Sequence, residues 1–282
     1  MFWNSRKREL DPTQGVLNSA TLLRSILVKV GSSQDVPSAA KEIVTLFNRY
    51  GAVVVEFSQD ESPREQLLCF KEIFGNSMPH DRANEDDIAE IAVSEDFQGY
   101  LGTSNLEHSF HTDGAYAQTP PRAVALRCDT PAAEGGITRL ASGDDIYQYL
   151  VKDNAEVARA LFAPNALRVS RAGKDSCQAL LQRVGDRISI RYRSDETSIP
   201  SEDALVREGM KKISTYLENC ANSMSFRLTH GQVLITDNLR TLHARTSFDS
   251  SEPRKMHRLF FDGNPSEKFN LEFGFIARPL SK

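Results

Sequence analysis

Phe110-His111-Thr112-Asp113-Gly114 is the stretch of this sequence that says most about its architecture. In an extended strand the side chains of residues i and i+2 point to the same face, so His111 and Asp113 can present an imidazole and a carboxylate side by side. A distant histidine would complete a face of two histidines and one carboxylate, the ligand set that suits non-heme Fe(II). Taken alone, the short pattern is better explained as a hydrogen-bonded pair at the surface.

A second block of sequence can supply the missing ligand. His243 stands in the segment 237–245, just after a strand predicted over 232–236, and lies 132 residues after His111. Arg254 and Arg258 follow His243 by 11 and 15 residues. A planar guanidinium can hold the carboxylate of a ligand through two parallel hydrogen bonds in a buried site. Each arginine taken singly is explained as an ordinary solvated surface residue, whereas the combined spacing favours a site.

The two blocks together resemble the taurine dioxygenase family, which are Fe(II)- and 2-oxoglutarate-dependent oxygenases with a clavaminate-synthase-like fold. The resemblance runs from about Ala39 to Gly263 and also includes Thr119-Pro120-Pro121 and Gly135-Gly136-Ile137-Thr138. It implies a β-rich α+β protein whose core is a double-stranded β-helix (jelly roll) with flanking helices.

The resemblance also implies a role for each matching residue. The iron ligands, which are also the catalytic residues, would be His111, Asp113 and His243. The co-substrate 2-oxoglutarate would be held at its distal carboxylate by Thr138 and Arg254, and O₂ would be the second co-substrate. Because related halogenases carry a small residue in place of the carboxylate, Asp113 favours hydroxylation or another oxidation over halogenation.

The reaction implied is oxidative decarboxylation of 2-oxoglutarate to succinate and CO₂, coupled to oxidation of an unactivated C–H bond. Hydroxylation is the simplest outcome, but the ligand set leaves desaturation, epoxidation or cyclisation in specialised metabolism open. A non-catalytic jelly-roll protein that binds a ligand is a second class, although it would have no use for a 2-oxoglutarate site. A zinc hydrolase is a third, although no general base stands at a signature spacing such as HExxH.

Three residues are candidates for binding the principal substrate. By the resemblance, Arg258 would meet an anionic group, and His80 would be a further substrate contact. Glu107, four residues before His111, could receive an ammonium group, and a surface charge explains it about equally well. A zwitterion would satisfy both kinds of charge, so an amino acid or a small derivative is the predicted substrate. His108 is predicted to be structural.

Composition limits the classes of partner. The chain carries 38 acidic and 34 basic residues, a net charge of −4, so no global field favours nucleic acid or an anionic membrane. No apolar run approaches the roughly 18 residues that span a bilayer, and the charged start 1–10 is unlike a signal peptide. The four cysteines form no CxxC pair, so we expect free, buried or semi-buried thiols in the cytoplasm. The sequence leaves the oligomeric state open.

Apolar periodicity and turn residues predict the elements that frame the site. Residues 1–20 are expected to be a loosely ordered N-terminal arm, and 21–282 a single domain, because the two halves of the site lie so far apart in sequence. Helices are predicted over 38–50, 63–75, 144–162 and 201–221. Strands are predicted over 52–57, 88–93, 124–128, 165–170, 187–193, 224–228, 232–236 and 258–262.

Overall fold

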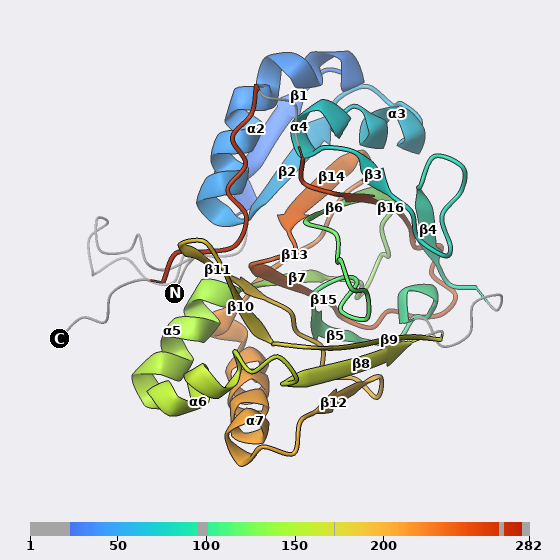
Figure 1. Ribbon diagram of the computed structural model, residues 1–282. Coiled ribbons are helices and arrows are strands. Elements are labelled where there is room, and N and C mark those ends of the chain that lie inside the picture. The colour runs from blue at the N-terminus through green and yellow to red at the C-terminus, as the bar shows by residue number, and fades with distance from the viewer. Residues whose placement is uncertain (1–22, 95–100, 172, 265–267, 278–282) are drawn as a thin grey trace, which may run out of the picture.

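The computed structural model describes residues 23–94, 101–171, 173–264 and 268–277, and the arm predicted over 1–20 lies outside them. Its largest sheet, the major sheet, has seven strands in the order β1-β2-β14-β6-β16-β3, with β4 paired to β16 (Figure 1). All of its pairs are antiparallel except the parallel pair β1–β2. Its strands are β1 (Leu27–Val30), β2 (Ala52–Phe57), β3 (Ser77–Met78), β4 (Ala89–Ala92), β6 (Ala123–Thr130), β14 (Gln232–Asp237) and β16 (Lys255–Phe261).

A second sheet of four antiparallel strands, the minor sheet, has the order β13-β7-β15-β5. Its strands are β5 (His108–His111), β7 (Thr138–Ser142), β13 (Met224–Phe226) and β15 (Thr241–Arg245). Two small sheets, β12-β8-β9 and β10-β11, lie beside it. Their strands are β8 (Leu167–Arg171), β9 (Lys174–Gln178), β10 (Leu181–Val184), β11 (Arg187–Ile190) and β12 (Ser198–Pro200).

Helices cover the outer face of each large sheet (Figure 1). The set on the major sheet is α2 (Val36–Tyr50), α3 (Pro63–Leu68) and α4 (Lys71–Phe74). The set on the minor sheet is α5 (Gly143–Asp153), α6 (Ala155–Ala160) and α7 (Ala204–Glu218). Short 3₁₀ turns are η2 (Ser33–Asp35), η3 (Leu101–Thr103) and η4 (Cys220–Asn222). Within the described residues, no helix combines the length and apolar character that crossing a membrane requires.

Successive side chains of a strand point to opposite faces of the sheet, and this alternation produces the layers. In β2, Val53 and Val55 pack against the helices, while Ala52 and Val54 pack inward. The inward cluster also contains Leu140 of the minor sheet, so the two sheets share one apolar interior. The chain is therefore a mixed α/β protein with many strands and few helices.

Most predicted elements are present, with differences that have local causes. The helix predicted over 63–75 is two helices, and that predicted over 144–162 is interrupted at Asn154, whose side chain accepts hydrogen bonds from two backbone N–H groups of α6. The expectation that all four thiols would be buried or semi-buried is wrong for two of them. Cys128 is buried and Cys69 intermediate, but Cys177 and Cys220 are exposed.

Candidate metal centre

A β-bulge in the minor sheet determines which side chains face the interior. His111 of β5 pairs with His243 of β15, and His108 pairs with Arg245, so two residues of β5, Ser109 and Phe110, oppose the single residue Ala244 of β15. The extra residue turns His108 to the same face as His111, where a regular strand would place it on the opposite face. His108, His111, His243 and Arg245 consequently line one cavity, here called the central cavity.

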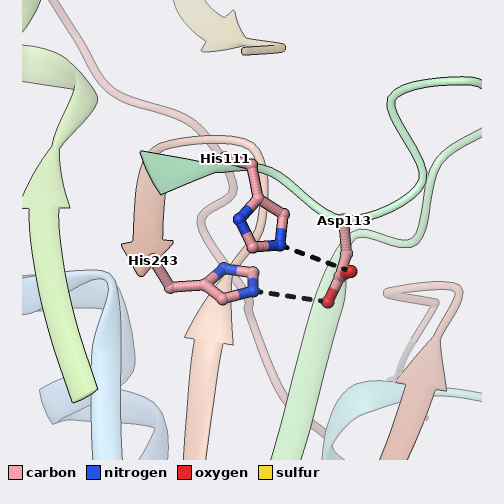
Figure 2. Close-up of side chains that lie close together, drawn as sticks. All are labelled: His111, Asp113 and His243. Atoms are coloured by element: carbon pink, nitrogen blue, oxygen red, sulfur yellow. Dashed lines mark ion pairs between the residues drawn. The ribbon is translucent and has the colours of Figure 1, made fainter. Parts of the chain in front are cut away.

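The central cavity brings together the two halves of the predicted metal site. Single ligand atoms of His111, Asp113 and His243 all lie within 4.8 Å of one another (Figure 2). The Asp113 carboxylate lies 3.9 Å from Nε2 of His111 and 3.5 Å from Nε2 of His243. Because three protein ligands lie on one side, an ion at this point would keep open positions for other ligands.

Both histidines are in the protonation state that a metal requires. Nδ1 of His111 lies 2.8 Å from the carbonyl oxygen of Ser109, which fixes Nδ1 as the donor and leaves the Nε2 lone pair toward Asp113. Burial lowers the pKa of His111 to about 3 and also lowers the pKa of His243. The two imidazoles are therefore neutral at physiological pH.

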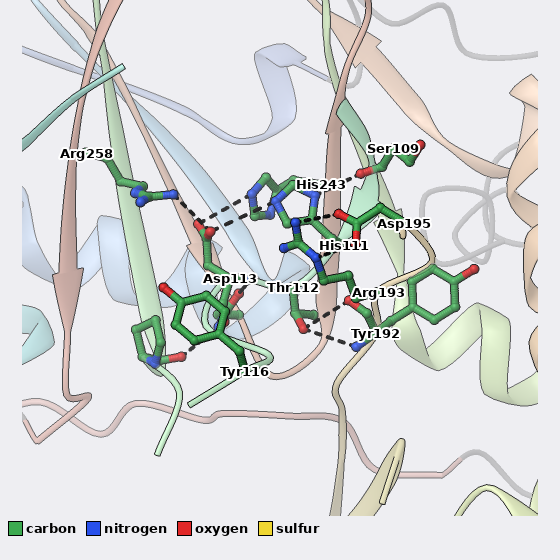
Figure 3. Close-up of polar contacts among 12 residues, drawn as sticks. Ser109, His111, Thr112, Asp113, Tyr116, Tyr192, Arg193, Asp195, His243 and Arg258 are labelled. Atoms are coloured by element: carbon green, nitrogen blue, oxygen red, sulfur yellow. Dashed lines mark hydrogen bonds and ion pairs between the residues drawn. The ribbon is translucent and has the colours of Figure 1, made fainter. Parts of the chain in front are cut away.

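The Asp113 carboxylate has one oxygen engaged and one without a partner. Nη1 of Arg258 donates to Oδ1 at 2.9 Å, whereas the buried Oδ2 has no hydrogen-bond partner (Figure 3). Burial by itself would raise the pKa of this carboxyl, but Arg258 and the neighbouring histidines outweigh it, so the pKa is lowered. An ionised, buried oxygen with an empty hydrogen-bonding position, facing two neutral imidazoles, fits a bound cation.

Gly114 gives the turn after Asp113 its shape. Its φ is +68°, and a Cβ atom built on it would lie 2.7 Å from Cδ of Pro121. The glycine is therefore required by the left-handed backbone and by the close approach of the proline.

Arg254 and Thr138 stand together in the wall of the same cavity. The Arg254 side chain is 94% buried, and no carboxylate pairs with it in the described part of the chain. Burial lowers its pKa to about 10, which records the cost of desolvating an uncompensated cation. A ligand carboxylate in the cavity would supply the missing charge.

The other face of Asp113 carries a second polar group of residues. Nη2 of Arg258 lies 3.2 Å from Nε2 of His80, and the Tyr116 hydroxyl lies 3.4 Å from the same nitrogen. Burial lowers the pKa of His80 to about 4, with the positive charge of Arg258 acting in the same direction. His80 thus lies beside Arg258, which in turn is bonded to Asp113.

Glu107 does not lie in the central cavity. Its side chain is 60% exposed, and its nearest basic group is Arg139, at 4.0 Å. In a regular strand, Glu107 and His111 would share a face, but the bulge turns Glu107 outward and His108 inward. The geometric basis for an ammonium contact at Glu107 is therefore lost.

His108 is a polar cavity residue that the sequence prediction assigned a structural role. Its ring stacks on that of His111, with centroids 3.8 Å apart and planes 19° apart, and its Nε2 is buried with no hydrogen-bond partner. His108 lies three residues before His111, and in a regular strand this odd spacing would place the two side chains on opposite faces. A bulge is the only signal that would have revealed His108, and it leaves no mark in the sequence.

The fold and the site define a class of protein: a strand-rich enzyme scaffold that presents two histidines and one carboxylate to a single ion between two sheets. The sequence model of the Taurine catabolism dioxygenase TauD, TfdA family matches residues 27–260. The chain belongs to this family, which confirms the resemblance found in its motifs.

Two curated relatives resemble part of the chain. Trimethyllysine dioxygenase of Meyerozyma guilliermondii is 26% identical over 159 residues, which cover 51% of this chain and 40% of that protein. Human gamma-butyrobetaine dioxygenase is 24% identical over 163 residues, 53% of this chain and 42% of that protein. The matched region thus spans about two fifths of the length of each relative.

Solved structures share the fold at low sequence identity. A taurine dioxygenase from Burkholderia xenovorans has a TM-score of 0.63 and 19% identity, over 85% of this chain and 88% of that chain. AAD-2 in complex with Mn(II) and N-oxalylglycine has a TM-score of 0.66 and 17% identity, over 86% and 96%. An asparagine oxygenase in complex with Fe(II), hydroxyasparagine and succinate has a TM-score of 0.59 and 19% identity, over 81% and 78%.

Proposed function

We propose that this protein is an Fe(II)- and 2-oxoglutarate-dependent dioxygenase that hydroxylates an unactivated C–H bond of a small polar substrate. The observation that carries the proposal is the pairing of two features in one cavity. Three ligand atoms lie within 4.8 Å of one another, and the uncompensated Arg254 guanidinium stands in the same wall. The first feature suits a cation, and the second suits a carboxylate of a co-substrate.

The residues fit both groups. His111, Asp113 and His243 would hold the iron, and Thr138 and Arg254 would hold the distal carboxylate of 2-oxoglutarate. Bound together, iron and 2-oxoglutarate supply the oxidising power for cleavage of a C–H bond by O₂, with succinate and CO₂ as the other products.

The chain's own contribution is orientation and exclusion of water. Apolar side chains of the major sheet, among them Val124, Leu126 and Leu234, line the central cavity and offer water no hydrogen-bond partner there. Arg258 holds one oxygen of Asp113 and leaves the other free for the ion. The neutral imidazoles offer lone pairs without first losing a proton.

An amino acid or small derivative remains our proposed substrate. Arg258 and His80, which meet beside Asp113, are the proposed contacts for its anionic group. The names of the two curated relatives, trimethyllysine dioxygenase and gamma-butyrobetaine dioxygenase, point to substrates of this kind. The site that would recognise an amine stays unassigned, because Glu107 lies outside the cavity.

We further infer that the two large sheets form a double-stranded β-helix, or jelly roll, and that 21–282 is one domain. The shared apolar interior and the meeting of residues 111 and 243 in one site support both inferences. The cytoplasmic location is likewise proposed from the sequence, and cell fractionation would test it.

A substrate screen tests the proposed activity. Purified protein with Fe(II), 2-oxoglutarate and O₂ is offered a panel of amino acids and their derivatives, and succinate is measured. We expect one class to raise succinate formation at least tenfold, and His111→Ala and Asp113→Ala to abolish the rise. Binding of 2-oxoglutarate without succinate formation from any compound would favour the non-catalytic binding protein. Mass analysis of the product separates hydroxylation from desaturation, epoxidation or cyclisation.

A further inference from the structure

The side chain of Asn238 is bonded to the backbone of the candidate ligand Asp113 on both sides. The Asp113 N–H donates to Oδ1 of Asn238 at 2.7 Å, and Nδ2 of Asn238 donates to the Asp113 carbonyl at 2.9 Å. The second hydrogen of Nδ2 is directed to the carbonyl of Pro121 at 2.8 Å. The amide is 99% buried, and both of its donor hydrogens are used.

These bonds replace a missing strand partner. β5 ends at His111, so Asp113 lies beyond the ladder that fixes His111 opposite His243. Thr112 is held separately, because its N–H donates to the Tyr192 carbonyl at 2.9 Å. Its hydroxyl also accepts a hydrogen bond from the Tyr192 N–H at 3.1 Å (Figure 3). The backbone N–H and C=O of a buried residue must find partners, and at Asp113 one side chain provides both.

Asn238 is itself firmly anchored. Its N–H donates to the Arg122 carbonyl at 2.9 Å. The preceding Asp237 is fully buried, lies 2.9 Å from Nε of Arg240 and accepts a hydrogen bond from the Gly274 N–H. Both residues stand at the turn from β14 into β15, the strand that carries His243. The turn that leads into the strand of His243 therefore also forms hydrogen bonds with the backbone of Asp113.

We propose that Asn238 is a positioning residue that sets the place of the Asp113 carboxylate relative to the two histidines, and thereby the affinity of the site for its metal ion. The proposal rests on the metal assignment made above. Only an amide has the acceptor and the two donors that these three groups require. An aspartate of the same shape would turn a carboxylate oxygen toward the carbonyls of Asp113 and Pro121, and a leucine would leave all three groups unpaired.

Metal titration of Asn238→Asp and Asn238→Leu tests the proposal, with Mn(II) as the probe and electron paramagnetic resonance reporting the free ion. Loss of a group that orients a metal ligand typically weakens binding 10- to 100-fold, and we expect this range for both variants. Asn222→Asp is the matched control, because Nδ2 of Asn222 donates to the Tyr216 carbonyl, remote from the site. We expect its Mn(II) affinity to equal that of the wild type.

A double variant separates positioning from a general structural role. If Asn238 acts through Asp113, adding Asn238→Asp to Asp113→Ala should change the residual Mn(II) affinity less than twofold. If Asn238→Asp lowered the Mn(II) affinity equally in the presence and in the absence of the Asp113 carboxylate, the proposal would be overturned. So would a folded Asn238 variant with wild-type affinity, or failure of both Asn238 variants to fold, which would make the residue structural. Failure of the wild type to bind Mn(II) would instead remove the metal assignment itself.

Discussion

Replacement of Arg254 with methionine should weaken the binding of 2-oxoglutarate without lowering the stability of the fold. Arg254 is 94% buried, and burial lowers its pKa from 12.5 to about 10. A difference of this size corresponds to about 3 kcal/mol of desolvation cost. Methionine removes that cost and loses only a cation–π contact with Phe248, worth about 1 kcal/mol. We expect the metal-free variant to be as stable as the wild type or about 2 kcal/mol more stable.

The affinity of the same variant for 2-oxoglutarate should fall. Truncating one partner of a desolvated, hydrogen-bonded charge pair costs about 2–5 kcal/mol. A loss of about 3 kcal/mol weakens the affinity of Arg254→Met for 2-oxoglutarate by roughly 100-fold or more. Calorimetric titration of Mn(II)-loaded protein under anaerobic conditions measures the affinity, and urea unfolding of metal-free protein measures the stability.

Arg245 provides the matched control, since it lines the same cavity and burial also lowers its pKa to about 10. Its Nη2, however, donates to the carbonyls of Ser104 and Leu106. Arg245→Met should therefore destabilise the fold by about 2 kcal/mol or more and weaken 2-oxoglutarate binding less than Arg254→Met does. Our reasoning is refuted if Arg254→Met binds 2-oxoglutarate within threefold of the wild type, or if its stability falls as that of Arg245→Met does.

Three further predictions concern neighbouring features. Gly136→Ala should weaken 2-oxoglutarate binding severalfold, because the added Cβ would lie 3.1 Å from Cδ and Nε of Arg254. Gly185 has a similar left-handed φ, and a Cβ built on it meets no atom within 4 Å, so Gly185→Ala should leave the 2-oxoglutarate affinity measured by calorimetry unchanged. An equal loss of affinity in both variants would contradict the idea that the Gly136→Ala methyl group displaces Arg254. Glu107→Gln should alter the KM for the principal substrate less than twofold, and a tenfold rise in steady-state assays would restore Glu107 to the site. The metal-free protein should lose stability as pH falls from 6.5 toward 3, by up to about 1.4 kcal/mol per pH unit for His111, because burial lowers its folded pKa from 6.5 to about 3. Urea unfolding at pH 7 and pH 5 measures this loss, which should be smaller in His111→Gln, and equal losses in both proteins would contradict it.

The parts of the fold that follow from local chemistry could be predicted from the sequence. The apolar run of β2 was located at its true bounds, 52–57, and α2 ends before Gly51, which has the left-handed φ of +72° typical of a helix C-terminus. The candidate ligands and the two arginines could be grouped from their spacing because it resembles that of the family whose model matches residues 27–260, and all five residues line the central cavity.

What the sequence could not reveal depends on non-local pairing. The bulge between β5 and β15 exists only once the two strands are paired, and it exchanges the faces of Glu107 and His108. β9 and β10 were missed because they are polar, and only their pairing with β8 and β11 makes them strands. The bonds from Asn238 to Asp113 join residues 125 positions apart, which no local pattern encodes.

The most direct test of the account is anaerobic absorbance of the Fe(II)-loaded protein on addition of 2-oxoglutarate. If His111, Asp113 and His243 hold iron beside the Arg254 carboxylate site, the weak visible charge-transfer band of the iron chelate should appear. It should be absent in His111→Ala and Asp113→Ala. No band in folded, iron-loaded wild-type protein, or an undiminished band in both variants, would contradict the assignment of this cavity as the oxygenase site.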